Sequence, residues 1–154
     1  MYPIVCLSAI LVFGGDPEIN RAACETPEVD VLAHPELGEN NGLDHVMARK
    51  AKENGVAIEF NFRQLLVNYK KSRSECFSRM LENAKLVKKY RTPFVLTSGA
   101  LSPWDLRGPP ELASFGRLLG FSDPEIRKAL EGGRIAENRK RLGSGWIMPG
   151  VEKA

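Results

Sequence analysis

The sequence has few of the side chains that bind metal ions or cross-link a chain. Its only histidines are His34 and His45, and its three cysteines, Cys6, Cys24 and Cys76, are far apart. A structural zinc site needs four ligands at close spacing, and the chain has no Cys-x-x-Cys pair. The pattern argues against a zinc module and against a disulfide framework. We therefore expect reduced thiols, most of them buried.

Long hydrophobic runs are also missing. The most apolar segment, Ile4–Phe13, is about half as long as a membrane-spanning helix needs to be. No basic region precedes it and no small-residue cleavage site follows it, which argues against a signal peptide. We interpret it as a buried strand, expect no contact with a membrane, and predict a cytoplasmic location.

Local catalytic signatures are absent as well. The sequence contains no Gly-x-Gly-x-x-Gly or Walker pattern, and no serine or cysteine lies in a recognisable nucleophile motif. His34 follows a predicted strand, but two histidines and scattered carboxylates fall short of the ligand set of a two-metal phosphoesterase. We therefore predict that this chain binds no cofactor or metal of its own.

The charge is unevenly distributed along the chain. Residues 1–61 carry 4 Lys and Arg against 10 Asp and Glu, whereas residues 62–154 carry 18 against 9, and the formal net charge of the whole is +3. A basic half suits contact with phosphate groups, because each neutralised phosphate releases counterions. The alternative is that the lysines only solvate the outer faces of helices.

Strand and helix patterns alternate along the chain. The predicted strands are Pro3–Phe13, Val29–Ala33, Val56–Phe62 and Pro93–Thr97. The predicted helices are Glu18–Cys24, Leu43–Glu53, Ser72–Tyr90 (opened by a Ser72–Glu75 capping box), Glu111–Leu119, one that opens at Ser122, and Arg134–Leu142.

This alternation predicts an α/β domain with parallel strands. A closed eight-stranded barrel needs roughly 200 residues or more, so the expectation is a partial, TIM-barrel-like α/β barrel that lacks the first strands. The barrel-like domain is assigned to residues 1–142, and residues 143–154 are expected to be a flexible tail.

Two arginines follow predicted strands directly. Arg63 comes after the strand Val56–Phe62, and Arg107 lies in the turn after the strand that ends at Thr97. Ligand-binding side chains of α/β barrels gather at the carboxyl ends of strands, so both are candidates for RNA contact. Either arginine could instead form a structural ion pair, for example to Glu59 or Asp105.

A second basic group ends the long predicted helix. Lys88, Lys89 and Arg91 are candidates for RNA binding, and Lys85 lies one turn before them. Positive charge at this position also stabilises the helix macrodipole, which alone would account for these residues.

Five segments, taken in their order and spacing, resemble one known family. They are Gly42–Val46, Val56–Leu66, Leu96–Ala100, Trp104–Pro109 and Ala113–Phe121. Together they are similar to the archaeal ribonuclease P protein component 3 family, the counterpart of the eukaryotic thirty-kilodalton subunit.

The resemblance implies a barrel-like, non-catalytic subunit that assists a catalytic RNA in removing 5′ leaders from precursor tRNA. It implies partnership with the ribonuclease P RNA, with ribonuclease P protein component 2 and with other protein subunits, in a holoenzyme that needs its RNA and Mg²⁺. Carried over by motif, Arg63 and Arg107 are implicated in function. A metal-dependent phosphoesterase on a related barrel remains the alternative.

The sequence departs from the family at particular positions. Gln64 stands where proline is usual and Gly99 where serine is frequent, and both departures are expected to loosen their loops. Family members also carry further strands before the matched region. The strand Pro3–Phe13 is therefore expected to have an unpaired edge, which would leave the chain unstable alone.

Overall fold

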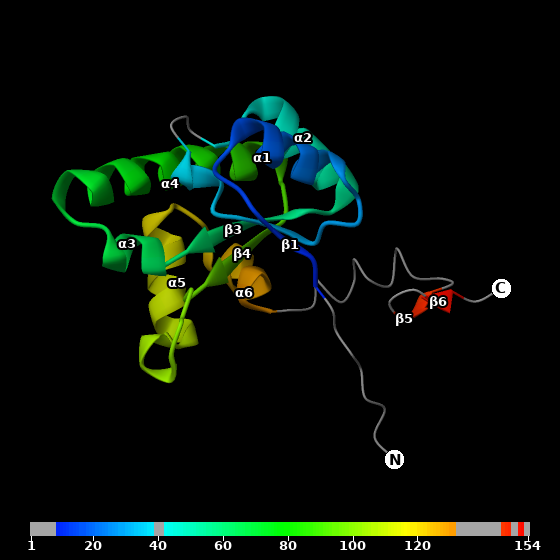
Figure 1. Ribbon diagram of the computed structural model, residues 1–154. Helices are drawn as coiled ribbons and strands as arrows, with labels where there is room; N and C mark the ends of the chain where they lie inside the picture. The colour runs from blue at the N-terminus through cyan, green and yellow to red at the C-terminus, as the bar shows by residue number, and fades with distance from the viewer. Residues whose placement is uncertain (1–8, 39–41, 132–145, 149–150, 153–154) are drawn as a thin grey trace, which may run out of the picture.

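The computed structural model describes residues 9–38, 42–131, 146–148 and 151–152. The described residues form an α/β fold around a sheet with strand order β1-β2-β3-β4, in which every neighbouring pair is parallel (Figure 1). The strands are β1 (Leu11–Phe13), β2 (Val31–Ala33), β3 (Ala57–Asn61) and β4 (Phe94–Thr97). Consecutive parallel strands with a helix between each pair are the repeating unit of an α/β barrel.

Helices connect the strands and cover the sheet. Figure 1 shows α1, α2 and α4 along one side of the sheet, and α5 and α6 beside β4. The α-helices are α1 (Pro17–Glu25), α2 (His45–Asn54), α3 (Arg63–Val67), α4 (Lys70–Tyr90), α5 (Pro109–Leu118) and α6 (Asp123–Leu130), and the 3₁₀ helices are η1 (Pro35–Leu37) and η2 (Pro103–Asp105).

Local sequence accounts for where the first two long helices begin and end. The Asp16 carboxylate caps α1, and the Asp44 carboxylate caps α2 by accepting hydrogen bonds from the backbone N–H groups of Val46 and Met47. The predicted end of α2 is confirmed, because Gly55 adopts a left-handed φ of 76° at the C-cap.

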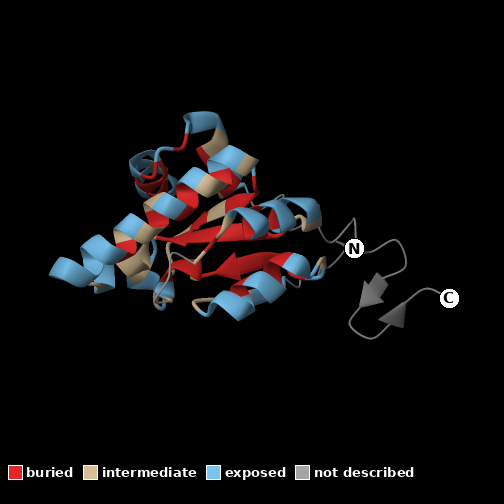
Figure 2. Cartoon of the chain, turned by 90° about the horizontal axis from the view of Figure 1, so that it is seen from above, coloured by how far each residue is buried: buried red, intermediate tan, exposed pale blue. Residues whose placement is uncertain are grey.

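The sheet buries one apolar face. The register places Leu32 beside Ile58, Ile58 beside Phe94 and Phe60 beside Leu96, so these side chains share a face, and none is more than 8% exposed. The Phe121 ring, which follows α5, stacks on Phe94 at 3.9 Å and meets Phe60 edge-on at 5.4 Å. Figure 2 shows buried residues on the strands and on the helix faces turned toward them.

The segment between β3 and α4 differs from its prediction. The helix α4 begins at Lys70 rather than at Ser72, and the Ser72 hydroxyl donates to Asn68 Oδ1 (2.7 Å) instead of forming the predicted capping box. The preceding helix α3 was not predicted, because its five residues are too few to display a helical period.

The first strand is less enclosed than its apolar sequence suggested. Within the described residues β1 starts at Leu11, lies at the border of the sheet and pairs only with β2. Leu11 is 56% exposed and Phe13 is 65% exposed. The prediction of a buried strand is wrong for these two residues, because both side chains lie on one face of β1 and the described residues leave that face largely uncovered. Residues 1–8 lie outside the described part.

Two of the three thiols are buried, as predicted. Cys24 and Cys76 are free and buried, and burial raises the pKa of Cys24 to about 12 and that of Cys76 to about 11. Both thiols therefore stay protonated and unreactive near neutral pH. Cys6 lies outside the described residues.

The carboxyl-terminal predictions are covered only in part. The helix predicted over Arg134–Leu142 lies outside the described residues, so the domain boundary at residue 142 stays a prediction. Within the predicted tail, β5 (Trp146–Met148) and β6 (Val151–Glu152) form an antiparallel pair. Every helix among the described residues is too short or too polar to span a lipid bilayer.

Candidate nucleic-acid interface

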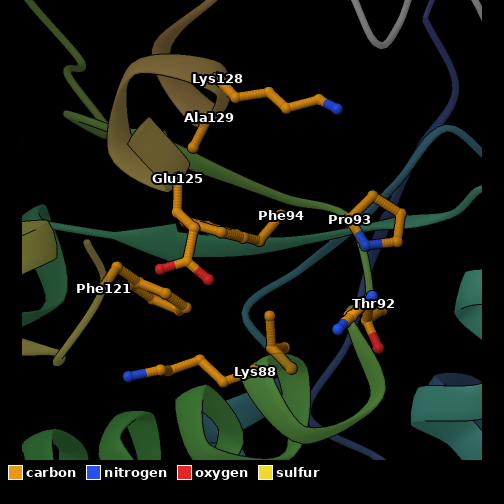
Figure 3. A pocket seen from close by; sticks show the side chains of 10 residues that line it. Lys88, Thr92, Pro93, Phe94, Phe121, Glu125, Lys128 and Ala129 are labelled. Atoms are coloured by element: carbon orange, nitrogen blue, oxygen red, sulfur yellow. The ribbon is translucent and has the colours of Figure 1, made fainter. Parts of the chain in front are cut away.

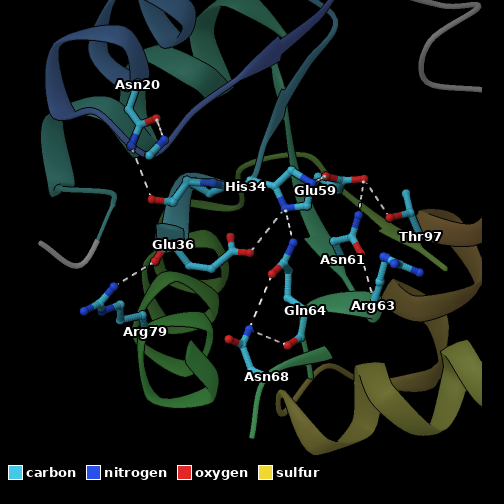
Figure 4. A network of polar contacts seen from close by, with 12 residues as sticks. Asn20, His34, Glu36, Glu59, Asn61, Arg63, Gln64, Asn68, Arg79 and Thr97 are labelled. Carbon is cyan, nitrogen blue, oxygen red and sulfur yellow. Dashed lines mark hydrogen bonds and ion pairs between the residues drawn. The ribbon is translucent and has the colours of Figure 1, made fainter. Parts of the chain in front are cut away.

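The carboxyl edge of the sheet carries a buried polar network (Figure 4). Glu59 and Asn61 of β3 and Thr97 of β4 share the face opposite the apolar one, because Asn61 lies beside Thr97 in the register. The Glu59 carboxylate is 6% exposed and accepts hydrogen bonds through Oε1 from the Thr97 hydroxyl (2.6 Å) and the Asn61 amide (3.4 Å). These bonds tie the ends of β3 and β4 together.

His34 lies between two buried carboxylates. It follows β2 with a left-handed φ of 52°. Its Nδ1 is 3.6 Å from Glu36 Oε1, and its Nε2 is 3.9 Å from Glu59 Oε2. The contact with Glu36 raises the pKa of His34 above its ordinary value, with Glu59 adding to the effect and burial opposing it. The two carboxylates therefore favour the protonated form of His34.

This arrangement does not resemble a metal centre. Glu36 and Glu59 approach different nitrogens of the His34 ring, so the three side chains do not converge on one point. Among the described residues, no group of three or more His, Cys, Asp or Glu side chains is placed to hold a metal ion. No observation in this region favours the phosphoesterase alternative.

Arg63 connects this network to the loop after β4. Its backbone N–H donates to Asn61 Oδ1 (3.0 Å), and its Nη1 lies 3.4 Å from Asp105 Oδ2, the ion pair that the sequence offered as an alternative. The same Asp105 oxygen accepts a hydrogen bond from the Ser102 hydroxyl (3.0 Å). Arg63 therefore contributes to the position of the loop at residues 98–108.

Arg107 lies in the same loop and stabilises it from within. Its Nη1 donates to the backbone oxygens of Leu106 (2.9 Å) and Trp104 (3.3 Å). The strand order places Arg63 and Arg107 at the same edge of the sheet, as predicted. Their role in RNA contact stays a prediction.

The other candidates lie at the opposite edge. Lys88 is in the last turn of α4 and Arg91 is its C-cap, and β4 starts just beyond at Phe94. Both line a cavity of about 300 Å³ beside Lys128 of α6. Figure 3 shows Lys88 and Lys128 on opposite sides of this cavity.

The interior of this cavity is mixed in character. Phe94 and Phe121 form apolar walls, and the Glu125 carboxylate is the acidic group in the lining. Hydrogen bonds from Ser122 lower the pKa of Glu125, so it is ionised near neutral pH. Lys88 also donates to the backbone oxygen of Gly120.

Lys89 is a candidate from the sequence that lies outside this cavity, and Lys128 is a lining residue that the sequence did not indicate. Lys89 does not line the cavity, and its ammonium lies 5.3 Å from the centre of the Tyr90 ring. The sequence indicated the start of the helix that carries Lys128, at Ser122, but not this residue. The position of Lys128 opposite Lys88 across the cavity depends on tertiary structure.

The two positions that depart from the family pattern both lie within the carboxyl-edge network. The Gln64 amide nitrogen is 3.4 Å from His34 Nδ1, and the Gln64 backbone oxygen accepts from the Asn68 amide (2.7 Å). Gly99 has a φ of 60°, and a Cβ there would lie 2.1 Å from Asn61 Oδ1. A serine at position 99 would therefore displace Asn61, which holds the Arg63 backbone.

Comparison with known proteins identifies the family. The sequence model of a family described as RNase P subunit p30 matches residues 5–141. The chain belongs to this family. The resemblance drawn from the sequence is thereby confirmed.

Individual relatives agree with this assignment. The chain is 37% identical over 147 residues to ribonuclease P protein component 3 of Methanosarcina mazei, covering 95% of this chain and 62% of the relative. It is 40% identical over 147 residues to the protein of the same name from Methanococcus maripaludis, covering 93% of this chain and 62% of the relative. The chain thus spans about three fifths of the length of these relatives.

A solved structure has the same fold. A chain in the cryo-EM structure of archaeal ribonuclease P with mature tRNA aligns with a TM-score of 0.79 and 34% identity, covering 94% of this chain and 63% of that chain. Together with the family match, this alignment confirms the predicted α/β, TIM-barrel-like fold class.

Proposed function

We propose that this chain acts as a protein subunit of ribonuclease P and assists the RNA in the endonucleolytic removal of 5′ leaders from precursor tRNA. The alignment of 94% of the chain with a protein of an archaeal ribonuclease P that holds tRNA carries the proposal. Catalysis is assigned to the RNA and its Mg²⁺, and this chain is assigned a supporting role.

The geometry is suited to binding RNA at two edges of the domain. At the carboxyl edge, Arg63 contacts the loop after β4 and Arg107 lies within it. At the opposite edge, Lys88, Arg91 and Lys128 surround a cavity. Guanidinium and ammonium groups bind phosphate oxygens, and arginine can do so through two parallel hydrogen bonds.

The proposal includes the partners expected of such a subunit. They are the ribonuclease P RNA, precursor tRNA, ribonuclease P protein component 2 and the other protein subunits, in the cytoplasm. The exposed apolar edge of β1 supports a need for a neighbouring chain, since Leu11 and Phe13 are more than half exposed.

Reconstitution tests the proposal. The ribonuclease P RNA and the remaining protein subunits are assembled with and without this chain, and cleavage of precursor tRNA is measured at fixed Mg²⁺. We expect the chain to increase cleavage at the mature 5′ end and to show no cleavage without the RNA. An assembly whose rate, Mg²⁺ requirement and cleavage site are all unaffected by the chain would contradict the proposal.

A further inference from the structure

The loop after β4 exposes an unusual group of apolar side chains. Trp104 is 90% exposed, Leu101 is 79% exposed and Leu106 is 64% exposed. A single exposed leucine is ordinary, but a tryptophan with almost its whole surface in water, between two exposed leucines, indicates a contact surface. Figure 1 shows this loop projecting from the body of the domain between β4 and α5.

The loop is held in place by hydrogen bonds. The Asp105 backbone N–H donates to the Ser102 oxygen (3.0 Å), and the Asp105 side chain binds the Ser102 hydroxyl and Arg63. Arg107 donates to the backbone oxygen of Trp104 itself (3.3 Å). The backbone that carries Trp104 is therefore ordered before any ligand binds, which lowers the entropic cost of using the ring for binding.

The same arginines place positive charge on the loop that carries the ring. Among the hydrogen bonds of the described residues, the guanidinium of Arg63 and that of Arg107 each donate only through Nη1. The other N–H groups of each planar fork remain for a phosphate oxygen. An exposed indole on a loop that two such guanidinium groups contact matches how proteins bind unpaired nucleotides, with the base stacked on an aromatic or apolar side chain and the backbone held by cations.

We propose that Trp104 stacks on an unpaired base of the ribonuclease P RNA, with Arg63 and Arg107 contacting the phosphates that flank this base. This inference rests on the proposed function. The observations favour RNA over a protein partner because both guanidinium groups lie in or against the loop that carries the ring. A protein contact is the alternative outcome of the test.

Fluorescence provides the direct test. The chain has two tryptophans, so in a Trp146→Phe background the signal comes from Trp104 alone. The probe is the ribonuclease P RNA without other proteins. We expect RNA to quench this fluorescence at low salt, because stacking brings the indole against a base. Unchanged fluorescence at RNA concentrations that saturate binding would overturn the inference.

Substitutions separate stacking from apolar burial. Trp104→Ala is expected to weaken RNA binding by roughly 5- to 100-fold, Trp104→Phe to retain most of the affinity, and Trp104→Leu to behave like Trp104→Ala. Because the ring is 90% exposed, all three variants should melt like the original chain. Tyr69→Ala is the matched control, because Tyr69 is an exposed aromatic (69%) outside this loop.

The possible outcomes remain distinct. If Leu serves as well as Phe at position 104, or if the substitutions weaken only binding to the other protein subunits, the residue is a protein contact and the inference is wrong. If the original chain stimulates cleavage and Trp104→Ala does so equally well at limiting RNA, the inference fails while the proposed function stands. If the original chain does not stimulate cleavage, the proposed function itself fails.

Discussion

Arg63, at the start of α3, is joined to Asp105, in the loop after β4, by an ion pair of 3.4 Å between Nη1 and Oδ2. The two residues are far apart in sequence, and they connect the ends of β3 and β4. Their side chains are 30% and 40% exposed, so the pair contributes about 0–1 kcal/mol to stability. It is one of the contacts that hold the loop carrying Trp104, beside those of Ser102 and Arg107.

Paired variants distinguish the two roles of Arg63. Arg63→Ala removes both the ion pair and a possible phosphate contact, whereas Asp105→Ala removes the ion pair and leaves the arginine. If Arg63 contacts a phosphate, Arg63→Ala should flatten the slope of log affinity against log salt for RNA binding by about 0.7–0.9, and Asp105→Ala should not. Equal salt slopes for both variants and the original chain would show that Arg63 acts only by positioning the loop.

The sequence predicted the framework of this fold well. Each of the four parallel strands falls within a predicted strand, and the Asn54-Gly55 end of α2 is correct, because these features depend on local apolar runs and turn residues. Arg63 was placed correctly because it follows a strand directly, and the position after a parallel strand fixes the edge of the sheet.

The rest of the site depends on tertiary contacts. His34 was noted only as a residue after a strand, since its carboxylate neighbour Glu59 comes from a different strand. Lys88 of α4 and Lys128 of α6 come from different helices and line the same cavity. The predicted basic residues also lie at two different edges of the sheet. The distribution of charge along the sequence could not show this division.

The His34 site should make stability depend on pH. The pKa of His34 is raised in the folded state. The contribution of His34 to the free energy of unfolding is therefore fully present below the ordinary histidine pKa of about 6.5, and it is lost as pH rises through the pKa of the folded state. We expect the original chain to melt at a higher temperature than His34→Gln. This difference in melting temperature should be largest below about pH 6.5 and should shrink above it. A gap that stays constant across this range would show that His34 is not held as a cation.

The cavity at the opposite edge should contribute to RNA affinity through charge. Lys128→Ala is expected to weaken RNA binding and to flatten the salt slope by about 0.7–0.9, because one phosphate contact is lost. Lys50→Ala is the matched control, since Lys50 lies on α2 and its ammonium pairs with Glu53 at 3.0 Å. If both variants bind RNA with equal affinity and equal salt slope, this cavity is not part of the RNA interface.

The open edge of β1 should promote association of the isolated chain. Within the described residues β1 pairs on one edge only, and the backbone groups of its other edge, together with the exposed Leu11, favour pairing with another strand. We expect Leu11→Lys to reduce self-association in sedimentation velocity, because an edge lysine opposes strand pairing. Val46→Lys, at an exposed position on α2 (37%), serves as the control. A cooperatively melting monomer of the original chain would contradict the expectation that this edge needs a partner.

The central claim is that the chain assists a catalytic RNA and does not itself cleave. Its most direct test is the multiple-turnover rate of precursor tRNA cleavage by the ribonuclease P RNA and the other protein subunits, measured with this chain added or omitted. The account predicts faster cleavage at the mature 5′ end with the chain present, and no cleavage by the chain without the RNA. Cleavage of precursor tRNA by the chain alone, abolished in His34→Ala, would contradict it.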